Sequence, residues 1–273
     1  MFATTKQRSS LSSALNMSRL VFHSVVRKIR QSHRIPLMSI FSSILQTVLF
    51  VLAFLLMFDM LGMRGAAIRG DFVLYIMSGI FLFQVHTQAV GAVSGAESSA
   101  SPMMQHAPMN TIISLCAAAI SSLYTQVVAL GCIFLVYYVG IQRYEIYDPI
   151  GCLGMVMLAW GSGCAIGLAV YAFKPWAPGF IGILSTVYQR ANMLASGKMF
   201  VANTLPSTML AMFDWNPLFH VIDQARGYTF INYVPRNSNL EYPLKLTLAF
   251  VFIGLIVQYY TNKRVSDSWS ARG

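Results

Sequence analysis

Charged side chains are scarce in this sequence. Only 10% of its 273 residues are Asp, Glu, Lys or Arg, whereas 56% are hydrophobic. A soluble domain normally carries about 25% charged residues. The mean hydropathy of +0.59 agrees with this imbalance. The shortage of charge excludes an ordinary soluble domain and indicates an integral membrane protein.

Long runs without any charged residue locate the expected membrane spans. A bilayer core of about 30 Å needs ~20 apolar residues per helix, and these continuous runs lack the alternation of a membrane barrel. We therefore predict an all-α integral membrane protein with six transmembrane helices. The expected spans are 36–60, 72–93, 110–139, 149–173, 179–200 and 246–262. They form one domain, 1–273, with a cytoplasmic arm (1–35), a six-span core (36–262) and a cytoplasmic tail (263–273).

Acidic residues are the scarcer sign, with 9 Asp and Glu against 19 Lys and Arg, so the formal net charge is +10. Such an excess can indicate nucleic-acid binding, but here the basic residues gather before the first span and after the last. Cytoplasmic loops of membrane proteins carry this bias. The distribution predicts two cytoplasmic termini in a cell inner membrane and no nucleic-acid partner.

The arm before the first span has the pattern of an amphipathic helix. From Leu11 to Arg34, basic side chains repeat every three or four residues, opposite an apolar side. The basic side comprises Arg19, His23, Arg27, Arg30 and Arg34, and the apolar side comprises Leu15, Phe22, Val25, Val26 and Ile29. Such a helix lies on an anionic leaflet or packs against a cytoplasmic partner. A merely solvated charged arm is the alternative.

Metal-ligand patterns are missing. The four cysteines lie singly inside spans, and no two histidines have the spacing of a zinc site. His86 and His106 are isolated in the sequence. His220 and Asp223 are three residues apart, but His-x-x-Asp alone is a weak indication of an active site. We expect no metal and no catalytic group.

A phosphate-binding loop is also missing. That loop reads G-x-x-x-x-G-K-[ST] after a strand. The nearest string, Ser196 to Met199, has Asn192 at the position of the first glycine and Met199 at that of the hydroxyl residue. The chain is therefore predicted to be no enzyme and to hold no cofactor of its own.

Two basic residues fall inside the fifth expected span. A lipid-facing charge near mid-bilayer costs at least ~2.5–3.5 kcal/mol, so Arg190 should face the protein interior or a polar path. A structural ion pair is the alternative for Arg190. Lys198, eight residues on, falls on roughly the same helical face, where it either extends an electropositive path or reaches to the outer interface.

The stretch FDWNPLFHVIDQARG, residues 213–227, is too polar to span a bilayer and too apolar for an ordinary solvent-exposed loop. Asn216 can cap a helix that begins at Pro217. The residues Leu218, Val221, Ile222 and Ala225 then form one apolar face, with Asp223 off it. Such a short helix predicts a re-entrant outer helical hairpin before the last span, which caps the outer end of a pathway.

Small residues repeat every four positions in the fourth expected span, at Ala159, Gly163 and Gly167. A stripe of this kind lets two membrane helices approach closely.

The sequence resembles the permease subunit of type-2 ABC exporters, with the closest similarity to capsular polysaccharide and O-antigen exporters. The resemblance rests on the string from Trp215 to Val221 and on a last span that ends in Lys263-Arg264. Pro108 to Ile113 is similar to that family's entry to the third span, and Arg190 matches a basic residue common in the fifth. Gln105 and His106 depart from the family, which often has basic residues there, and Lys198 stands where an apolar residue is usual.

The resemblance implies a homodimer with two identical ATPase subunits, which use ATP and Mg. The polymer, a lipid-linked polysaccharide of the capsular type, would cross between the two permease copies, and a periplasmic polysaccharide co-polymerase or export protein is a further expected partner. The residues expected along the pathway are Arg190, Lys198, Trp215, Asn216, Pro217, His220, Asp223 and Arg226. Those expected to receive the ATPase movement are Glu97, Gln105, His106, Arg27 and Arg30.

Three alternatives remain open from the sequence. One is a type-2 ABC permease for a drug or a lipid. Another is a membrane enzyme that modifies a glycolipid. The third is a secondary transporter, a class that more often shows inverted repeats and carboxylates at the membrane midplane.

Overall fold

A computed structural model describes residues 10–32, 36–60, 62, 70–97 and 111–270. These residues form nine α-helices and one short 3₁₀ helix. The elements are α1 (Ser10–Ser32), α2 (Pro36–Met60), α3 (Phe72–Ser94), α4 (Thr111–Gly140), α5 (Pro149–Phe173), α6 (Pro178–Ala195), η2 (Ala202–Thr204), α7 (Ser207–Phe213), α8 (Pro217–Thr229) and α9 (Glu241–Ser270). The predicted all-α class is confirmed for the described residues.

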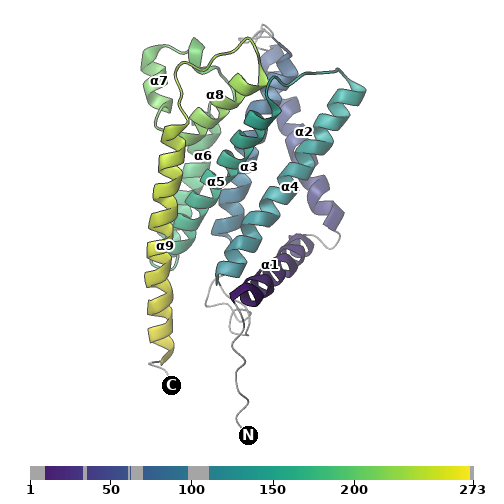
Figure 1. The fold of residues 1–273 in the computed structure, drawn as a ribbon. Coiled ribbons are helices and arrows are strands. Elements are labelled where there is room, and N and C mark those ends of the chain that lie inside the picture. The colour runs from purple at the N-terminus through teal and green to yellow at the C-terminus, as the bar shows by residue number, and fades with distance from the viewer. Residues whose placement is uncertain (1–9, 33–35, 61, 63–69, 98–110, 271–273) are drawn as a thin grey trace.

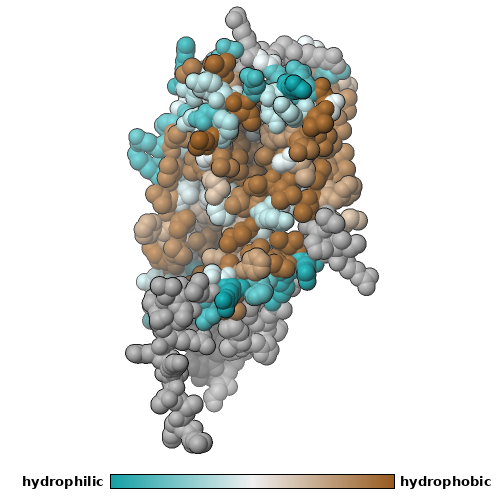
Figure 2. Space-filling model, turned by 45° about the vertical axis from the view of Figure 1, so that its right-hand side comes forward, coloured by the Kyte–Doolittle hydropathy of each residue, from teal (hydrophilic) through white to brown (hydrophobic). Residues whose placement is uncertain are grey.

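The long helices stand side by side as a bundle, and the shorter ones gather at its ends (Figure 1). Helix α1 lies across the bundle at the end where α9 ends, while α7 and α8 lie at the opposite end (Figure 1). Hydrophobic side chains form a broad belt across the middle of the face that Figure 2 shows, with hydrophilic side chains above and below it. A belt of this kind matches the hydrocarbon layer of a bilayer.

Five of the described helices are long and apolar enough to cross a membrane: Ile40–Met60 of α2, then α3, α4, α5 and Glu241–Lys263 of α9. Helix α6, the expected fifth span, is not among them. It has 18 residues, which corresponds to about 27 Å at 1.5 Å per residue, and it contains Arg190 and Asn192. The count of six spans stays a prediction.

Two helix boundaries differ from the expectation. The fifth span was expected to reach Phe200, but α6 ends at Ala195, and Gly197 adopts a left-handed φ of +75°. The chain turns there because glycine enters this conformation without steric cost. The last helix starts at Glu241, earlier than the expected 246, and continues to Ser270.

Helix α3 lies at the centre of the bundle, and most of its residues are buried. Its neighbour α5 approaches through the predicted small-residue stripe. A methyl group at Gly163 would lie 2.5 Å from the carbonyl oxygen of His86, and one at Gly167 would lie 2.9 Å from that of Val90. Ala159 is fully buried in the same contact. The stripe therefore makes the predicted close helix contact, and its partner is α3.

This interface yields a stability prediction. Gly163→Ala should lower the thermal unfolding midpoint of the detergent-purified chain, because overpacking a close contact costs about 1–3 kcal/mol. Gly154→Ala, on the same helix, is the matched control, since no atom lies within 4 Å of a methyl group there. Alanine favours a helix over glycine, so the control should be neutral or stabilising. Equal midpoints for the two variants would contradict the close approach.

Candidate functional site

The predicted re-entrant helix α8 begins as expected. The Asn216 side chain accepts a hydrogen bond from the Leu218 N–H at 3.0 Å, and Pro217 takes the first helical position. The four residues of the predicted apolar face are all buried between α3 and α5. The sequence thus placed both the start and the buried face of α8 correctly.

Asn216 also ties this cap to the neighbouring helix. Its amide nitrogen donates to Asn192 Oδ1 at 2.6 Å and to the carbonyl of Ala195 at 3.0 Å. Asn216 has no exposed surface. Its hydrogen bonds therefore fix α8 to the end of α6, and its predicted place on the substrate pathway stays a prediction.

The hydrogen bonds of Asn216 and Asn192 continue into the bundle through a buried histidine, His86. His86 Nδ1 lies 3.2 Å from the Ala159 carbonyl and 3.0 Å from Ser162 Oγ, and its Nε2 lies 2.8 Å from Tyr188 Oη. Asn192 Nδ2 lies 3.4 Å from the same Nε2. Because a carbonyl can only accept, this arrangement assigns the proton to Nδ1 and makes Nε2 an acceptor. Helices α3, α5, α6 and α8 are thereby joined by one hydrogen-bonded chain.

The sequence did not predict this hydrogen-bonded network. His86 looks isolated in the sequence because its partners Tyr188 and Asn192 are about a hundred positions away. A signal was present, since both partners lie four residues apart on α6 and therefore share one helical face. Polar side chains inside apolar spans find partners within the protein.

Arg226 holds the turn that follows α6. Its guanidinium donates to the carbonyls of Gly197 at 2.9 Å, Lys198 at 3.0 Å and Phe200 at 2.6 Å. It also stacks on the Tyr75 ring, 4.4 Å from the centroid. Only 1% of Arg226 is exposed. Arg226, expected along the pathway, is a core residue, and any effect of Arg226 on a substrate must pass through the segment that it holds.

Lys198 takes neither of the two orientations expected for it. It is 3% exposed, and its Nζ lies 3.5 Å from the centroid of the Phe83 ring, with Phe50 and Phe54 at about 5.5 Å. Its Nζ has no hydrogen-bond partner among the described residues. The expectation assumed one continuous helix through Arg190 and Lys198, but the turn at Gly197 directs Lys198 into the core.

Arg190 remains at the surface of α6. It is exposed, and it makes no ion pair with the described residues. The structural ion pair considered above therefore has no support within the described part of the chain. Trp215, the other exposed pathway residue, donates its indole N–H to the Met212 carbonyl and is 53% exposed. These two side chains are the pathway candidates that a ligand can reach from outside.

His220 and Asp223 form no hydrogen bond with each other, although their spacing allows one. His220 Nε2 donates to the Asp214 carbonyl at 2.8 Å, and its Nδ1 accepts the Asn239 N–H. Asp223, expected off the buried face, is only 2% exposed and accepts from the Tyr233 and Ser238 hydroxyls. Burial and the Asp223 carboxylate raise the pKa of Tyr233, which keeps its hydroxyl a donor. Both residues therefore fasten the chain from 230 to 240 onto α8.

Two of the expected coupling residues meet at the other end of the bundle. Arg27 Nη2 of α1 lies 3.4 Å from Glu97 Oε2, just beyond the end of α3. The Glu97 carbonyl accepts the Tyr171 hydroxyl of α5 at 3.0 Å. Arg30 is exposed on α1, whereas Gln105 and His106 lie outside the described residues. The contact ties α1 to α3 and α5.

The described residues contain no cluster of His, Cys, Asp or Glu that could hold a metal ion. The four cysteines are free. The polar groups gathered around α8 make hydrogen bonds to one another and to the backbone. Such an arrangement can position a helix and carry its movement.

No protein-family model matches the chain. Two sequences from Escherichia coli, each called polysialic acid transport protein KpsM, are similar to it. They are 22% and 21% identical over 189 residues, which is 68% of this chain and 71% of each relative. The similarity confirms the resemblance to capsular polysaccharide export permeases that the sequence predicted.

The Arg226 contacts yield a second stability prediction. Arg226→Gln should destabilise the chain by about 3 kcal/mol or more, because several buried carbonyls lose a charged donor and each unsatisfied group costs ~1–3 kcal/mol. Arg236→Gln is the matched control, since Arg236 is exposed. Thermal unfolding and limited proteolysis between 196 and 206 would measure both. Unchanged protection of this segment from proteolysis in Arg226→Gln would show that Arg226 does not hold the turn after α6.

Proposed function

We propose that this chain is the membrane permease subunit of an ATP-driven exporter that moves a lipid-linked polysaccharide, of the capsular type, across the inner membrane. The observation that carries the proposal is the similarity to the KpsM proteins, which are named for polysialic acid transport. The helical hairpin α7–α8 at the end of the bundle opposite α1 supports the same reading. In this arrangement both termini are cytoplasmic.

The energy comes from a separate subunit in this proposal. The chain carries no phosphate-binding loop, so two copies of a partner ATPase would bind ATP and Mg. The contact between Arg27 and Glu97 supports a path for the ATPase movement, because a force on α1 or on the end of α3 would reach both at once. The segment that holds Gln105 and His106 would complete that contact surface.

A homodimer would explain why α6 carries exposed apolar residues and an exposed arginine. This helix buries only Asn192 and Ala195 against its own chain, while Ile183, Val187 and Arg190 are exposed. A guanidinium that faces lipid is expensive. A second copy, with the polymer between the two, would cover this face and give Arg190 a polar path. Capsular glycans and their lipid carriers are commonly anionic, and arginine binds carboxylate and phosphate through two parallel hydrogen bonds.

The proposal that ATP is hydrolysed by a separate subunit can be tested directly. The purified chain should show no ATP hydrolysis, and activity should appear when the partner ATPase is added. Both proteins should be reconstituted in the same lipid vesicles, with a catalytically inactive ATPase as the control. Hydrolysis by the isolated chain at a rate above that control would refute the permease proposal.

The role of Arg190 has its own test in cells that carry each variant. Arg190→Ala should lower polysaccharide export about tenfold or more, since a charge-assisted hydrogen bond is worth ~1.5–3 kcal/mol. Arg190→Lys should retain part of the export, because the charge stays and the planar fork is lost. Thr186→Ala, one turn earlier on the exposed part of α6, is the control. Surface polysaccharide, membrane-inserted chain and co-purified ATPase should be measured together.

The outcomes separate the two possible roles of Arg190. Normal export by Arg190→Ala would remove its role on the pathway. Loss of folded chain in Arg190→Ala, with normal levels in Thr186→Ala, would instead assign Arg190 to contacts that hold the dimer together.

A further inference from the structure

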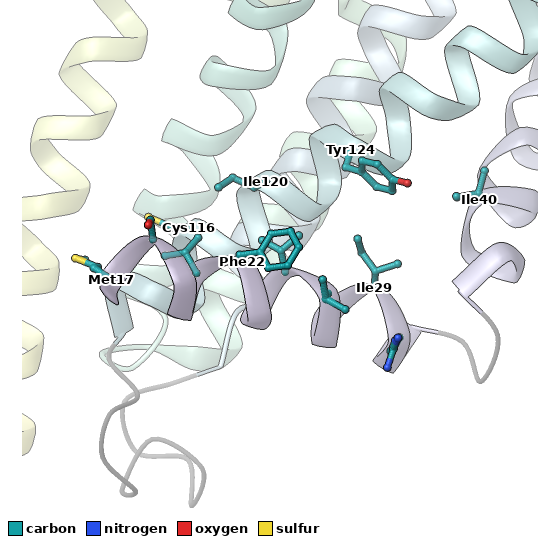
Figure 3. Close-up of a pocket in the computed structure, with 12 residues that line it drawn as sticks. Met17, Phe22, Ile29, Ile40, Cys116, Ile120 and Tyr124 are labelled. Atoms are coloured by element: carbon teal, nitrogen blue, oxygen red, sulfur yellow. The ribbon is translucent and has the colours of Figure 1, made fainter. Parts of the chain in front are cut away.

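Helix α1 forms one wall of an apolar groove of about 1040 Å³. The opposite walls are α4 and the start of α2, and Figure 3 shows Met17, Phe22 and Ile29 of α1 on one side and Ile120 and Tyr124 of α4 on the other. Phe22 is 64% exposed even though it lies over the bundle. The groove has the size of a site for a drug-sized or lipid ligand, about 300–1,000 Å³.

A second cavity, polar and about 310 Å³ in volume, lies next to this groove. Ile29 borders both cavities. The polar cavity is lined by residues of α1, α2, α3 and α4, most of them with hydroxyl or amide side chains. Lys28 is the charged residue in its lining. An apolar volume and a polar one therefore meet at the junction of α1 with the bundle.

The polar cavity offers both acceptors and donors. The hydroxyls of Ser121, Ser122 and Thr125 donate to carbonyls of their own helix, which leaves their oxygen lone pairs as acceptors. Gln126 lines the cavity and is only 5% exposed, and its amide group can both donate and accept hydrogen bonds. An amide that lines a polar cavity can hydrogen-bond the hydroxyl groups of a ligand. Lys28 adds a cation suited to phosphate.

We propose that the two cavities together bind one anionic phospholipid of the surrounding bilayer, with a hydroxyl-bearing headgroup such as that of phosphatidylglycerol. Its acyl chains lie in the groove between α1 and α4, its phosphate contacts Lys28, and its headgroup hydroxyls reach the amide of Gln126. Lys28 in the cavity lining favours an anionic lipid, because a basic residue contributes about 1 kcal/mol of attraction next to an anionic headgroup. An apolar helix of a second copy would fill the groove and leave the polar cavity without a partner.

The proposal does not depend on the exported substrate. A lipid in this position would hold α1 against α2 and α4, and so would support the element that carries Arg27. Its binding can be measured on the full chain without ATPase or transport, so its failure would be distinguishable from a failure of the proposed function.

The test is native mass spectrometry of the delipidated full-length chain, titrated with phosphatidylglycerol or with phosphatidylcholine of the same acyl chains. The wild-type chain should retain one phosphatidylglycerol per copy at the lowest lipid concentrations. Lys28→Gln should weaken this binding about fivefold, the effect of one basic residue near a membrane surface. Arg19→Gln is the matched control, because Arg19 is exposed on the same helix and lines neither cavity.

Two further variants test the two halves of the site. Ile120→Trp fills the groove and should weaken both lipids, whereas Gln126→Leu removes the amide and should weaken phosphatidylglycerol alone. Thermal unfolding without lipid confirms that each variant is folded. Equal binding of both lipids by the wild-type chain, or an equal loss in Lys28→Gln and Arg19→Gln, would overturn the proposal. Cross-linking between copies through a cysteine placed at Phe22 would also overturn it, because a second chain would then occupy the groove.

Discussion

Helix α6 ends where its neighbouring helices continue, and the guanidinium of Arg226 makes this end possible. After α6 ends, the carbonyls of Gly197, Lys198 and Phe200 have no helical partner, and Arg226 donates to all three. Inside a membrane protein, irregular backbone persists only where other protein groups satisfy it. Gly79 of α3 leaves the space, since a methyl group there would lie 3.0 Å from the guanidinium and 2.9 Å from Lys198. The position of α8 depends on this contact.

A second polar connection joins α8 to α6 and to the centre of the bundle. Asn216 joins the start of α8 to Asn192, and Tyr188 and Asn192 reach His86 at the centre of the bundle. A helix held by hydrogen bonds in an apolar environment has few alternative positions, because each broken bond leaves an unsatisfied group. A movement of α6 would therefore carry α8 with it. In an exporter this would link the surface of α6 to the hairpin.

The opposite end of the bundle is organised by charge and by an amphipathic helix. Arg27 reaches Glu97, so α1 contacts the end of α3 while its apolar side faces α4. Helix α1 lies across the bundle, and the long helices rise away from it (Figure 1). The apolar groove lies between α1 and α4. This geometry creates an apolar groove and a polar cavity side by side.

The sequence by itself determined the helical class, the amphipathic arm, the capped start of α8 at Asn216 and the stripe of Gly163 and Gly167. Each follows from the order of neighbouring residues, through apolar runs, cap chemistry or helical period. Only the tertiary structure decided where Lys198, Arg226 and His86 lie, because their partners are distant in sequence and a single left-handed glycine, Gly197, redirects the chain. The prediction that Arg190 and Lys198 share one helical face assumed an unbroken helix. That assumption failed because α6 ends before the turn at Gly197.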